Sequence, residues 1–132
     1  MDANMNRAKE ALRVCEDICR FFYDQPSWTR QWKDIRHRLT AVLVPLDCGK
    51  ALEARDIGKD VGKRTTFSES RRFSAGDVFR ANAQRAKESL RVLEECAKLS
   101  DQGAAESLKK LRYRLYALEQ KVLKGTHGRD ED

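Results

Sequence analysis

The chain has 132 residues, 40% hydrophobic and 36% charged, with only two prolines and seven glycines, which indicates one helical domain and argues against the β-sheet classes. Its net charge of +6 favours anionic partners, namely nucleic acid, an acidic surface or phosphorylated small molecules. A basic surface that simply faces solvent is an equally compatible reading.

Two helices are predicted in the first part of the chain. Between residues 5 and 22, apolar side chains recur at steps of three and four residues, which is typical of a helix with one buried face. Asp2 is the expected N-cap of this helix. Pro26 interrupts the pattern, and a second apolar stripe then runs over residues 28–46. We expect Pro45 to end or kink the second helix.

A long polar connection follows at residues 47–74, with three glycines and one short helix expected around Ala51. Connections of this length inside a compact domain are usually functional or disordered. A third helix is predicted over residues 75–99 and a fourth over residues 104–123. Residues 125–132 have neither periodicity nor apolar side chains, so we expect a flexible tail there.

The chain contains an internal repeat. Residues 3–17 (ANMNRAKEALRVCED) align without gaps on residues 81–95 (ANAQRAKESLRVLEE), and ten of the fifteen positions are identical. The helices that follow also correspond, because residues 35–39 (IRHRL) match residues 111–115 (LRYRL). We therefore predict an all-α domain over residues 1–124, in which repeat one (2–46) and repeat two (75–124) are αα-hairpins. Together they would form a four-helix bundle with pseudo-twofold symmetry, joined by a long functional connection.

Targeting signals and metal motifs are absent from the sequence. No apolar run approaches the roughly 18 residues of a membrane span, and the N-terminus does not resemble a signal peptide, so we expect a cytoplasmic protein. The four cysteines form no CxxC pair, and we expect reduced thiols, mostly in the core, in preference to a metal or redox site: they are Cys15, Cys19, Cys48 and Cys96.

Two asparagines and two arginines lie where a plain core helix would carry apolar side chains. Asn4 falls in the apolar stripe of the first helix and Arg7 on its flank, and Asn82 and Arg85 repeat this placement in the third. Burying such groups costs free energy unless they are paired. Two interpretations stay open: they bind a ligand in a shared polar hollow, or they hold helix ends and pair with carboxylates across the bundle.

Further charged groups gather on the polar helix faces and in the connection. The first set is most simply a series of intrahelical ion pairs: Glu10, Arg13 and Asp17, with Glu88, Arg91 and Glu95. In the connection, glycines allow close backbone approach, cations neutralise phosphate, and Asp56 or Asp60 would suit Mg²⁺. No Walker, Rossmann or protein-kinase motif is present, so a basic loop without a ligand remains the alternative.

Several separated motifs, in order, resemble the hydroxymethylpyrimidine-phosphate kinase domain that many bacteria fuse ahead of thiamine-phosphate synthase, a family unrelated to the ribokinase-like enzymes. They cover nearly the whole chain: residues 2–10 (DANMNRAKE), 12–17 (LRVCED), 54–56 (ARD), 60–62 (DVG), 82–85 (NAQR), 88–95 (ESLRVLEE) and 112–119 (RYRLYALE). The resemblance implies transfer of the γ-phosphoryl group of ATP to 4-amino-2-methyl-5-hydroxymethylpyrimidine phosphate, with Mg²⁺, in thiamine biosynthesis. Synthase activity is expected from a separate protein.

The inward placement expected for the repeated Asn and Arg residues, together with the needs of phosphoryl transfer, suggests roles for individual residues. Arg7 and Arg85 would grip phosphates, while Asp56 or Asp60 would hold Mg²⁺ or accept a proton. Substrate-binding residues would be Asn4, Asn82, Asp2 and Arg55. The nucleotide would be held by Lys59, Gly62, Lys63 and Arg72.

Other functions stay open at this point. A helical module that binds RNA or a protein would use the basic surface, although basic and acidic residues alternate along each helix instead of forming a one-sided stripe. A helper without activity would bind pyrimidine phosphate without consuming ATP. Formation of a homodimer and association with a separate thiamine-phosphate synthase are also left open.

Overall fold

We describe residues 2–46 and 74–127 from a computed structural model of the protein. Within them, the secondary structure is all helical, as predicted: α1 (Asp2–Phe21), α2 (Pro26–Leu43), α4 (Ala75–Ala97) and α5 (Gln102–Gly125). The short helix expected around Ala51 lies outside the described residues. No helix in this part of the chain is long and apolar enough to cross a membrane.

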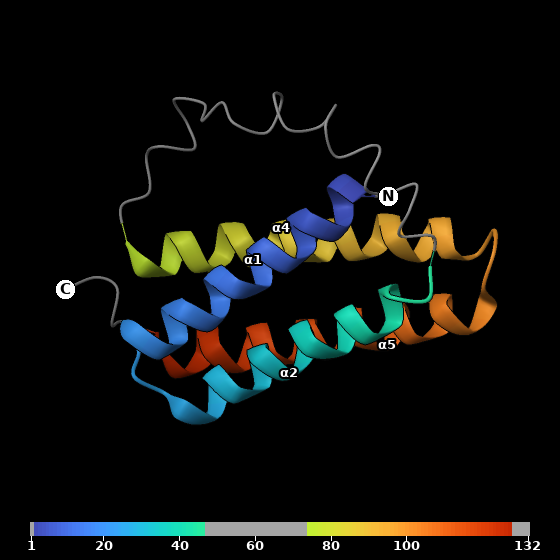
Figure 1. Cartoon of the computed structure of the whole chain (residues 1–132). Coiled ribbons are helices and arrows are strands. Elements are labelled where there is room, and N and C mark those ends of the chain that lie inside the picture. Colours follow the sequence, from blue (N-terminus) through green and yellow to red (C-terminus); the bar gives the residue numbers. More distant parts are fainter. Residues whose placement is uncertain (1, 47–73, 128–132) are drawn as a thin grey trace, which may run out of the picture.

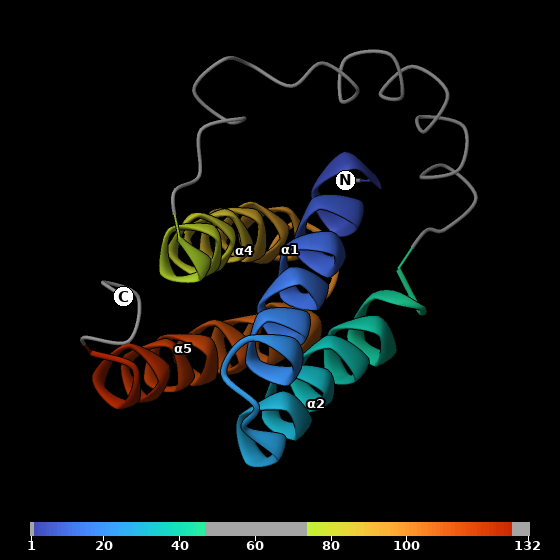
Figure 2. The ribbon, with the colours of Figure 1, turned by 90° about the vertical axis from the view of Figure 1, so that its left-hand side faces the viewer.

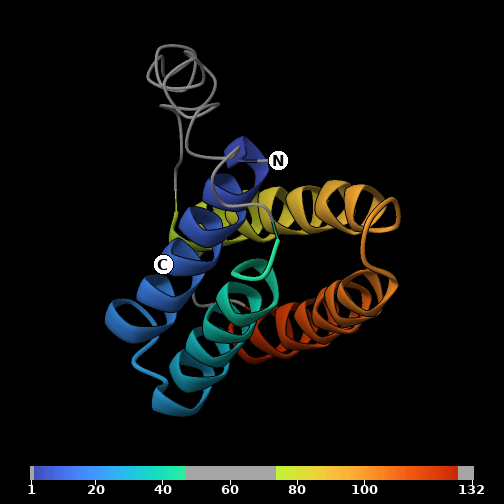
Figure 3. The same cartoon turned by 45° about the vertical axis from the view of Figure 1, so that its right-hand side comes forward.

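The helices form a four-helix bundle in which each packs against two others (Figure 1). α1 contacts α2 and α4, and α5 contacts the same two helices. The views in Figures 2 and 3 show the α1–α2 hairpin lying against the α4–α5 hairpin, with α1 passing obliquely over α4. Because neither hairpin can bury its apolar stripe alone, each provides the other's core.

Equivalent positions of the two repeats are buried in this core. Ala8 and Leu12 of α1 correspond to Ala86 and Leu90 of α4, and all four are fully buried. In the second helix of each hairpin, Ile35 and Leu39 correspond to Leu111 and Leu115, and these four residues are also buried. The observed burial therefore agrees with the pseudo-twofold bundle predicted from the repeat. An edge-to-face contact with ring centroids 5.5 Å apart joins the hairpins further, between Trp32 and Phe79.

Local sequence signals account for the observed ends of the helices. Pro26 is the first residue of α2, where its fixed φ suits the helix and its missing N–H is not needed. The same helix ends at Leu43, shortly before Pro45, as predicted. The N-caps of α4 and α5 are Ser74 and Asp101, whose side-chain oxygens accept backbone hydrogen bonds of 3.1 and 3.0 Å.

Two expectations about the chain ends need correction. Asp2 was expected to cap the first helix, but it lies within α1 and is buried. Its role as an N-cap is therefore wrong. The tail was expected to begin at residue 125, but α5 runs through Gly125, and Thr126 is buried with its hydroxyl donating to the Val122 carbonyl at 2.8 Å. The packed part of the chain extends further because Gly125 lies against the Trp28 indole.

Candidate functional site

The first candidate surface is built from the repeated Asn and Arg residues of α1 and α4. Asn4 and Asn82 are half-buried, whereas Arg7 and Arg85 are exposed. Asn82 Nδ2 donates to the Val78 carbonyl of its own helix at 2.9 Å. Arg7 Nη1 lies 3.5 Å from Asn4 Oδ1, at the outer limit of a hydrogen bond. The asparagines thus face partly inward as predicted, but the arginines reach solvent.

The packing of α1 on α4 locates these arginines relative to the internal symmetry. Cys15 Sγ lies 3.8 Å from the Phe79 carbonyl oxygen, and the two helices run in roughly opposite directions (Figure 1). Moving seven residues back from Cys15 and seven forward from Phe79 leads to Ala8 and Ala86, which are equivalent in the repeat and fully buried. We infer that the pseudo-twofold axis passes between these small residues. Arg7 and Arg85 directly precede them, so both arginines lie beside the axis.

The arginines lie on the side of α1 and α4 that faces away from α2 and α5. Lys87 reaches α5 through its ion pair with Glu119, and Arg85, two residues earlier, is roughly 200° away around α4. Glu16 reaches α2 through Arg36, and Arg7, nine residues earlier, is about half a turn away around α1. We call this surface, with Asn4, Arg7, Asn82 and Arg85, the outer face.

Of the other predicted site residues, the structure describes only Asp2. Asp2 is buried at the start of α1, which limits its direct access to a ligand. The predicted residues of the connection lie outside the described residues, and their roles stay predictions: Arg55, Asp56, Lys59, Asp60, Gly62, Lys63 and Arg72.

Each hairpin contains one buried ion pair that was not predicted from the sequence. Arg36 Nε lies 3.0 Å from Glu16 Oε1 in the first hairpin, and Arg112 Nε lies 3.0 Å from Glu94 Oε1 in the second. Both carboxylates are almost completely buried. Each pair joins the two helices of one hairpin at repeat-equivalent positions. The repeat could have indicated these ion pairs, because both copies have the same Glu and the same Arg at equivalent positions, which the apolar periodicity does not explain.

The polar faces of α1 and α4 carry intrahelical ion pairs, as predicted. Arg13 Nε lies 3.6 Å from Asp17 Oδ1, and Arg91 Nη2 lies 3.3 Å from Glu95 Oε1. In α1, Glu16 also accepts from Arg20 at 2.8 Å. The Arg13–Asp17 and Arg91–Glu95 pairs are largely exposed to water and stabilise their helices only slightly, whereas the Glu16 carboxylate is buried.

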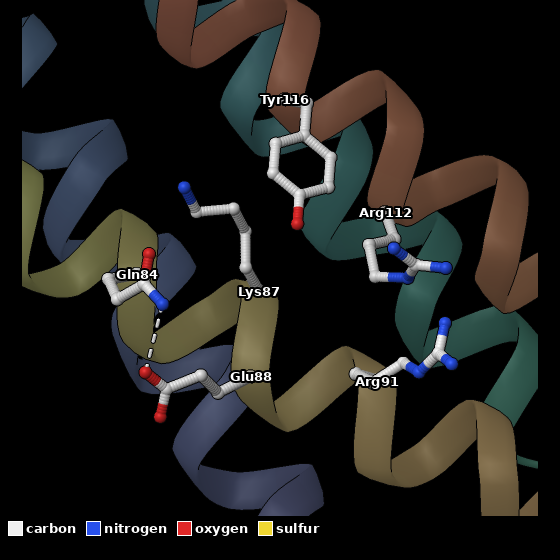
Figure 4. Close-up of a pocket in the computed structure, with 6 residues that line it drawn as sticks. All are labelled: Gln84, Lys87, Glu88, Arg91, Arg112 and Tyr116. Carbon is white, nitrogen blue, oxygen red and sulfur yellow. Dashed lines mark hydrogen bonds between the residues drawn. The ribbon is translucent and has the colours of Figure 1, made fainter.

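A hollow of about 410 Å³ lies between α4 and α5, and we call it the α4/α5 hollow (Figure 4). Four residues of α4 and two of α5 line it: Gln84, Lys87, Glu88, Arg91, Arg112 and Tyr116. In Figure 4 the Arg91 side chain extends toward the guanidinium group of Arg112, while Gln84 donates to Glu88 at 3.0 Å. None of the predicted site residues lines this hollow. Sequence reasoning missed it because Arg91 and Glu88 were assigned to intrahelical pairs only.

Two cations of the hollow, Lys87 and Arg112, contact carboxylates and an aromatic ring. Lys87 Nζ lies 2.8 Å from Glu119 Oε1 and 4.9 Å from the centre of the Tyr116 ring. Burial opposes the charge of Arg112, but hydrogen bonds to Glu94 and Tyr116 favour it more, so the pKa of Arg112 is raised. Arg112 therefore stays charged at any physiological pH.

Two core thiols are unsuited to nucleophilic chemistry. Burial, with smaller contributions from Cys19 and Glu119, raises the pKa of Cys15 well above its ordinary value. Burial also raises the pKa of Cys19 to about 12, although the neighbouring Trp32 indole acts in the opposite direction. Both side chains stay protonated at neutral pH and pack as small apolar groups, as the sequence predicts.

The described residues offer no obvious metal centre. Residues 2–46 and 74–127 contain no group of three or more His, Cys, Asp or Glu side chains arranged to hold an ion. This part of the chain therefore does not fit a protein-bound Mg²⁺ site by itself, and Asp56 and Asp60 lie outside it.

Comparison with known proteins shows similarity along nearly the whole chain. The model of the ThiD2 family matches residues 1–121. A protein named thiamine-phosphate synthase from Synechocystis sp. is 40% identical over 93% of this chain and 35% of its own length. Proteins of the same name from Thermosynechococcus vestitus and Rhodopirellula baltica are 38% and 36% identical, over 91% and 89% of this chain and 33% and 32% of their own lengths. The chain thus spans about a third of these relatives. No solved structure matches it.

Proposed function

The chain belongs to the ThiD2 family, and from this membership we propose that it transfers the γ-phosphoryl group of ATP to hydroxymethylpyrimidine phosphate in thiamine biosynthesis. The products are ADP and the pyrimidine diphosphate. The names of the similar proteins support the pathway. Because this chain corresponds to about a third of each of them, we assign the kinase step, and not the synthase step, to the matched third.

The structural observation that carries this proposal is the outer face. The repeat brings Arg7 and Arg85 to the pseudo-twofold axis, where both are exposed to solvent. Transfer between two phosphorylated substrates requires neutralisation of several negative charges and alignment of the groups that react. Two symmetry-related arginines suit this task, since each guanidinium donates bidentate hydrogen bonds to phosphate.

The chemistry makes few other demands on the protein. The attacking atom is an oxygen of the substrate phosphate, which is largely ionised at neutral pH because its second pKa is about 6. No general base is therefore needed. Asn4 and Asn82, half-buried beside the arginines, would orient the pyrimidine or a phosphate oxygen. When bound, Mg²⁺ would offset charge on the ATP phosphates, and we keep Asp56 and Asp60 as its proposed ligands.

The test is an assay that couples ADP release to a measurable signal, with ATP, Mg²⁺ and the pyrimidine monophosphate. Arg7→Ala and Arg85→Ala should each lower kcat by about 100-fold or more, since a charge-stabilising donor is lost. The matched control is Arg80→Ala, because Arg80 is another exposed α4 arginine and pairs with Asp77 at 2.8 Å. Its turnover should be unchanged, and circular dichroism should show full helicity in all variants.

Three results would contradict parts of this proposal. Unchanged turnover in both variants would remove the outer face from the site. Failure of the wild-type chain to form product, with retained binding of the pyrimidine phosphate, would favour the non-catalytic helper. Salt-sensitive binding of RNA without ATP turnover would favour the nucleic-acid module.

A further inference from the structure

The α4/α5 hollow combines converging cations with one aromatic ring. We propose that it binds a phosphate-bearing heteroaromatic compound, with the phosphate between Arg91 and Arg112 and the planar ring against Tyr116. The chemical class of this ligand follows from the hollow alone. Lys87 lines the hollow, and Arg85 lies roughly 200° away around α4, so this is a second binding site, separate from the outer face. The nucleotide and the pyrimidine phosphate share the required chemistry.

Three cations converge on the hollow. Lys87, Arg91 and Arg112 line it together with Glu88, and a phosphate would compete with the carboxylate that each cation already contacts: Glu119, Glu95 and Glu94, respectively. Glu88 accepts from Gln84 at 3.0 Å. In Figure 4 the Arg91 side chain extends toward the guanidinium group of Arg112. A phosphate has several acceptor oxygens and can therefore bridge two neighbouring guanidiniums.

The partners of the cations leave donors available for a ligand. Arg112 uses its Nε toward Glu94, at 3.0 Å, and also hydrogen-bonds Tyr116, so only part of its Nη donors is left for a ligand. The pair is buried, which fixes the guanidinium and lowers the entropy lost on binding. Arg91 contacts Glu95 through Nη2 at 3.3 Å, in a pair where both side chains are about half exposed. Such a pair is weak and is readily exchanged for a phosphate contact.

The Tyr116 ring offers a surface for a planar group. It is 42% exposed and lines the hollow from α5. Lys87 Nζ approaches its ring at 4.9 Å, within the distance of a cation–π contact. Stacking of a heterocycle on an accessible aromatic ring contributes roughly 1–3 kcal/mol per base in nucleic-acid complexes. The same stacking would retain a pyrimidine or a purine here while its phosphate is held by the arginines.

The first hairpin supplies a matched comparison. Its equivalents of Lys87, Glu88, Arg91 and Arg112 are identical residues: Lys9, Glu10, Arg13 and Arg36. The equivalent of Tyr116 is Thr40, which has no ring. The cations alone therefore do not distinguish the two hairpins, but the aromatic surface does. We place the ligand in the second hairpin for this reason.

The experiment measures binding by calorimetry to the full chain, with ADP, the pyrimidine monophosphate and inorganic phosphate as probes. Arg91→Ala should weaken all three by about tenfold or more, because a charged hydrogen bond is lost. Tyr116→Leu should weaken ADP or the pyrimidine monophosphate by about tenfold and leave inorganic phosphate unchanged. Arg13→Ala is the control, since Arg13 matches Arg91 in exposure and in its i, i+4 carboxylate partner. The ring-bearing probe that responds to Tyr116→Leu identifies the source of the ligand.

The outcomes separate this inference from the proposed kinase activity. If Arg13→Ala weakens binding as much as Arg91→Ala, or if Tyr116→Leu affects no ring-bearing probe, the inference is wrong even when the wild-type chain is an active kinase. If the wild type forms no product but shows the expected losses in binding, the inference stands and the kinase proposal fails. Absence of binding of every probe to the wild type also overturns the inference.

Discussion

Glu94 and Arg112 form a buried ion pair with an Nε–Oε1 distance of 3.0 Å, and Arg112 also lines the α4/α5 hollow. A charge that loses its partner in such a place cannot be solvated adequately. The pair thus links the stability of the α4–α5 hairpin to the geometry of a binding surface. The first hairpin repeats it with Glu16 and Arg36.

Glu94→Ala should lower the free energy of unfolding by about 3–5 kcal/mol, because Arg112 is left buried without its carboxylate. Urea denaturation followed by circular dichroism measures the change. Replacing both Glu94 and Arg112 with Met should recover part of the loss, since no unpaired charge remains. Glu95→Ala is the exposed control and should leave the midpoint almost unchanged. Equal effects of Glu94→Ala and Glu95→Ala would contradict the importance of burial.

The thiol of Cys19 makes stability depend on alkaline pH. Its pKa is about 12 in the native protein, compared with an ordinary value of 9.0. As the pH rises above 9.0, the unfolded chain releases this proton while the native chain retains it. Stability conferred by this group is therefore present below pH 9.0 and is lost as the pH rises toward 12. Urea midpoints between these pH values should fall less steeply in Cys19→Ala, and an unchanged slope would contradict the assignment.

At the scale of elements, the end of α5 is shaped by its contact with α2. Gly125 is the last residue of α5, and a Cβ atom built there would lie 2.6 Å from the Trp28 indole. Replacing a helical glycine with alanine normally helps by roughly 1 kcal/mol. Here the ring blocks the additional atom. A contact between helices therefore overrides the local preference.

Gly125→Ala should destabilise the protein by about 1–3 kcal/mol, in proportion to the displacement of the indole. Gly103→Ala is the matched control within the same helix, because its nearest neighbour is the Asp101 carboxylate oxygen at 3.3 Å, which is able to move slightly. Thermal unfolding compares the two. A Gly125→Ala variant as stable as the wild type would show that Trp28 is free to shift.

The whole molecule depends on packing between the two hairpins. α1 contacts α4, and α2 contacts α5, so each hairpin lies against both helices of the other. This arrangement predicts that covalent continuity through the connection is not needed once the bundle has formed. A single protease site introduced within residues 47–73, cleaved in the folded protein, should leave the fragments together in size-exclusion chromatography. Separation of the fragments in native buffer would contradict this prediction.

Much of the fold was predictable because its signals are local or repeated. Apolar spacing identified the helices, Pro45 predicted the end of α2, and the alignment of the two repeats predicted the bundle. The errors were at chain ends, where tertiary contacts decide: Asp2 is buried within α1, and Gly125 is held against Trp28. Propensity alone does not report such contacts.

The candidate sites were only partly predictable. The repeat pointed to Arg7 and Arg85, and the structure adds that they lie on the outer face and reach solvent. The α4/α5 hollow was not predicted. Arg91 and Arg112 belong to different helices, so their spacing in the sequence does not indicate that their guanidinium groups lie close together. The sequence likewise does not distinguish Tyr116 from the other residues of α5, because its place in the hollow depends on its neighbours in α4.

By itself, the sequence determined the helical class, the duplication and the set of charged residues that both hairpins share. Those properties follow from hydrophobic period and from identity between the repeats, which need no knowledge of distant contacts. Only the tertiary structure decided which of the shared charges are buried in ion pairs, which reach solvent and which surround a hollow. The reason is that burial and electrostatic pairing depend on the side chains contributed by neighbouring helices.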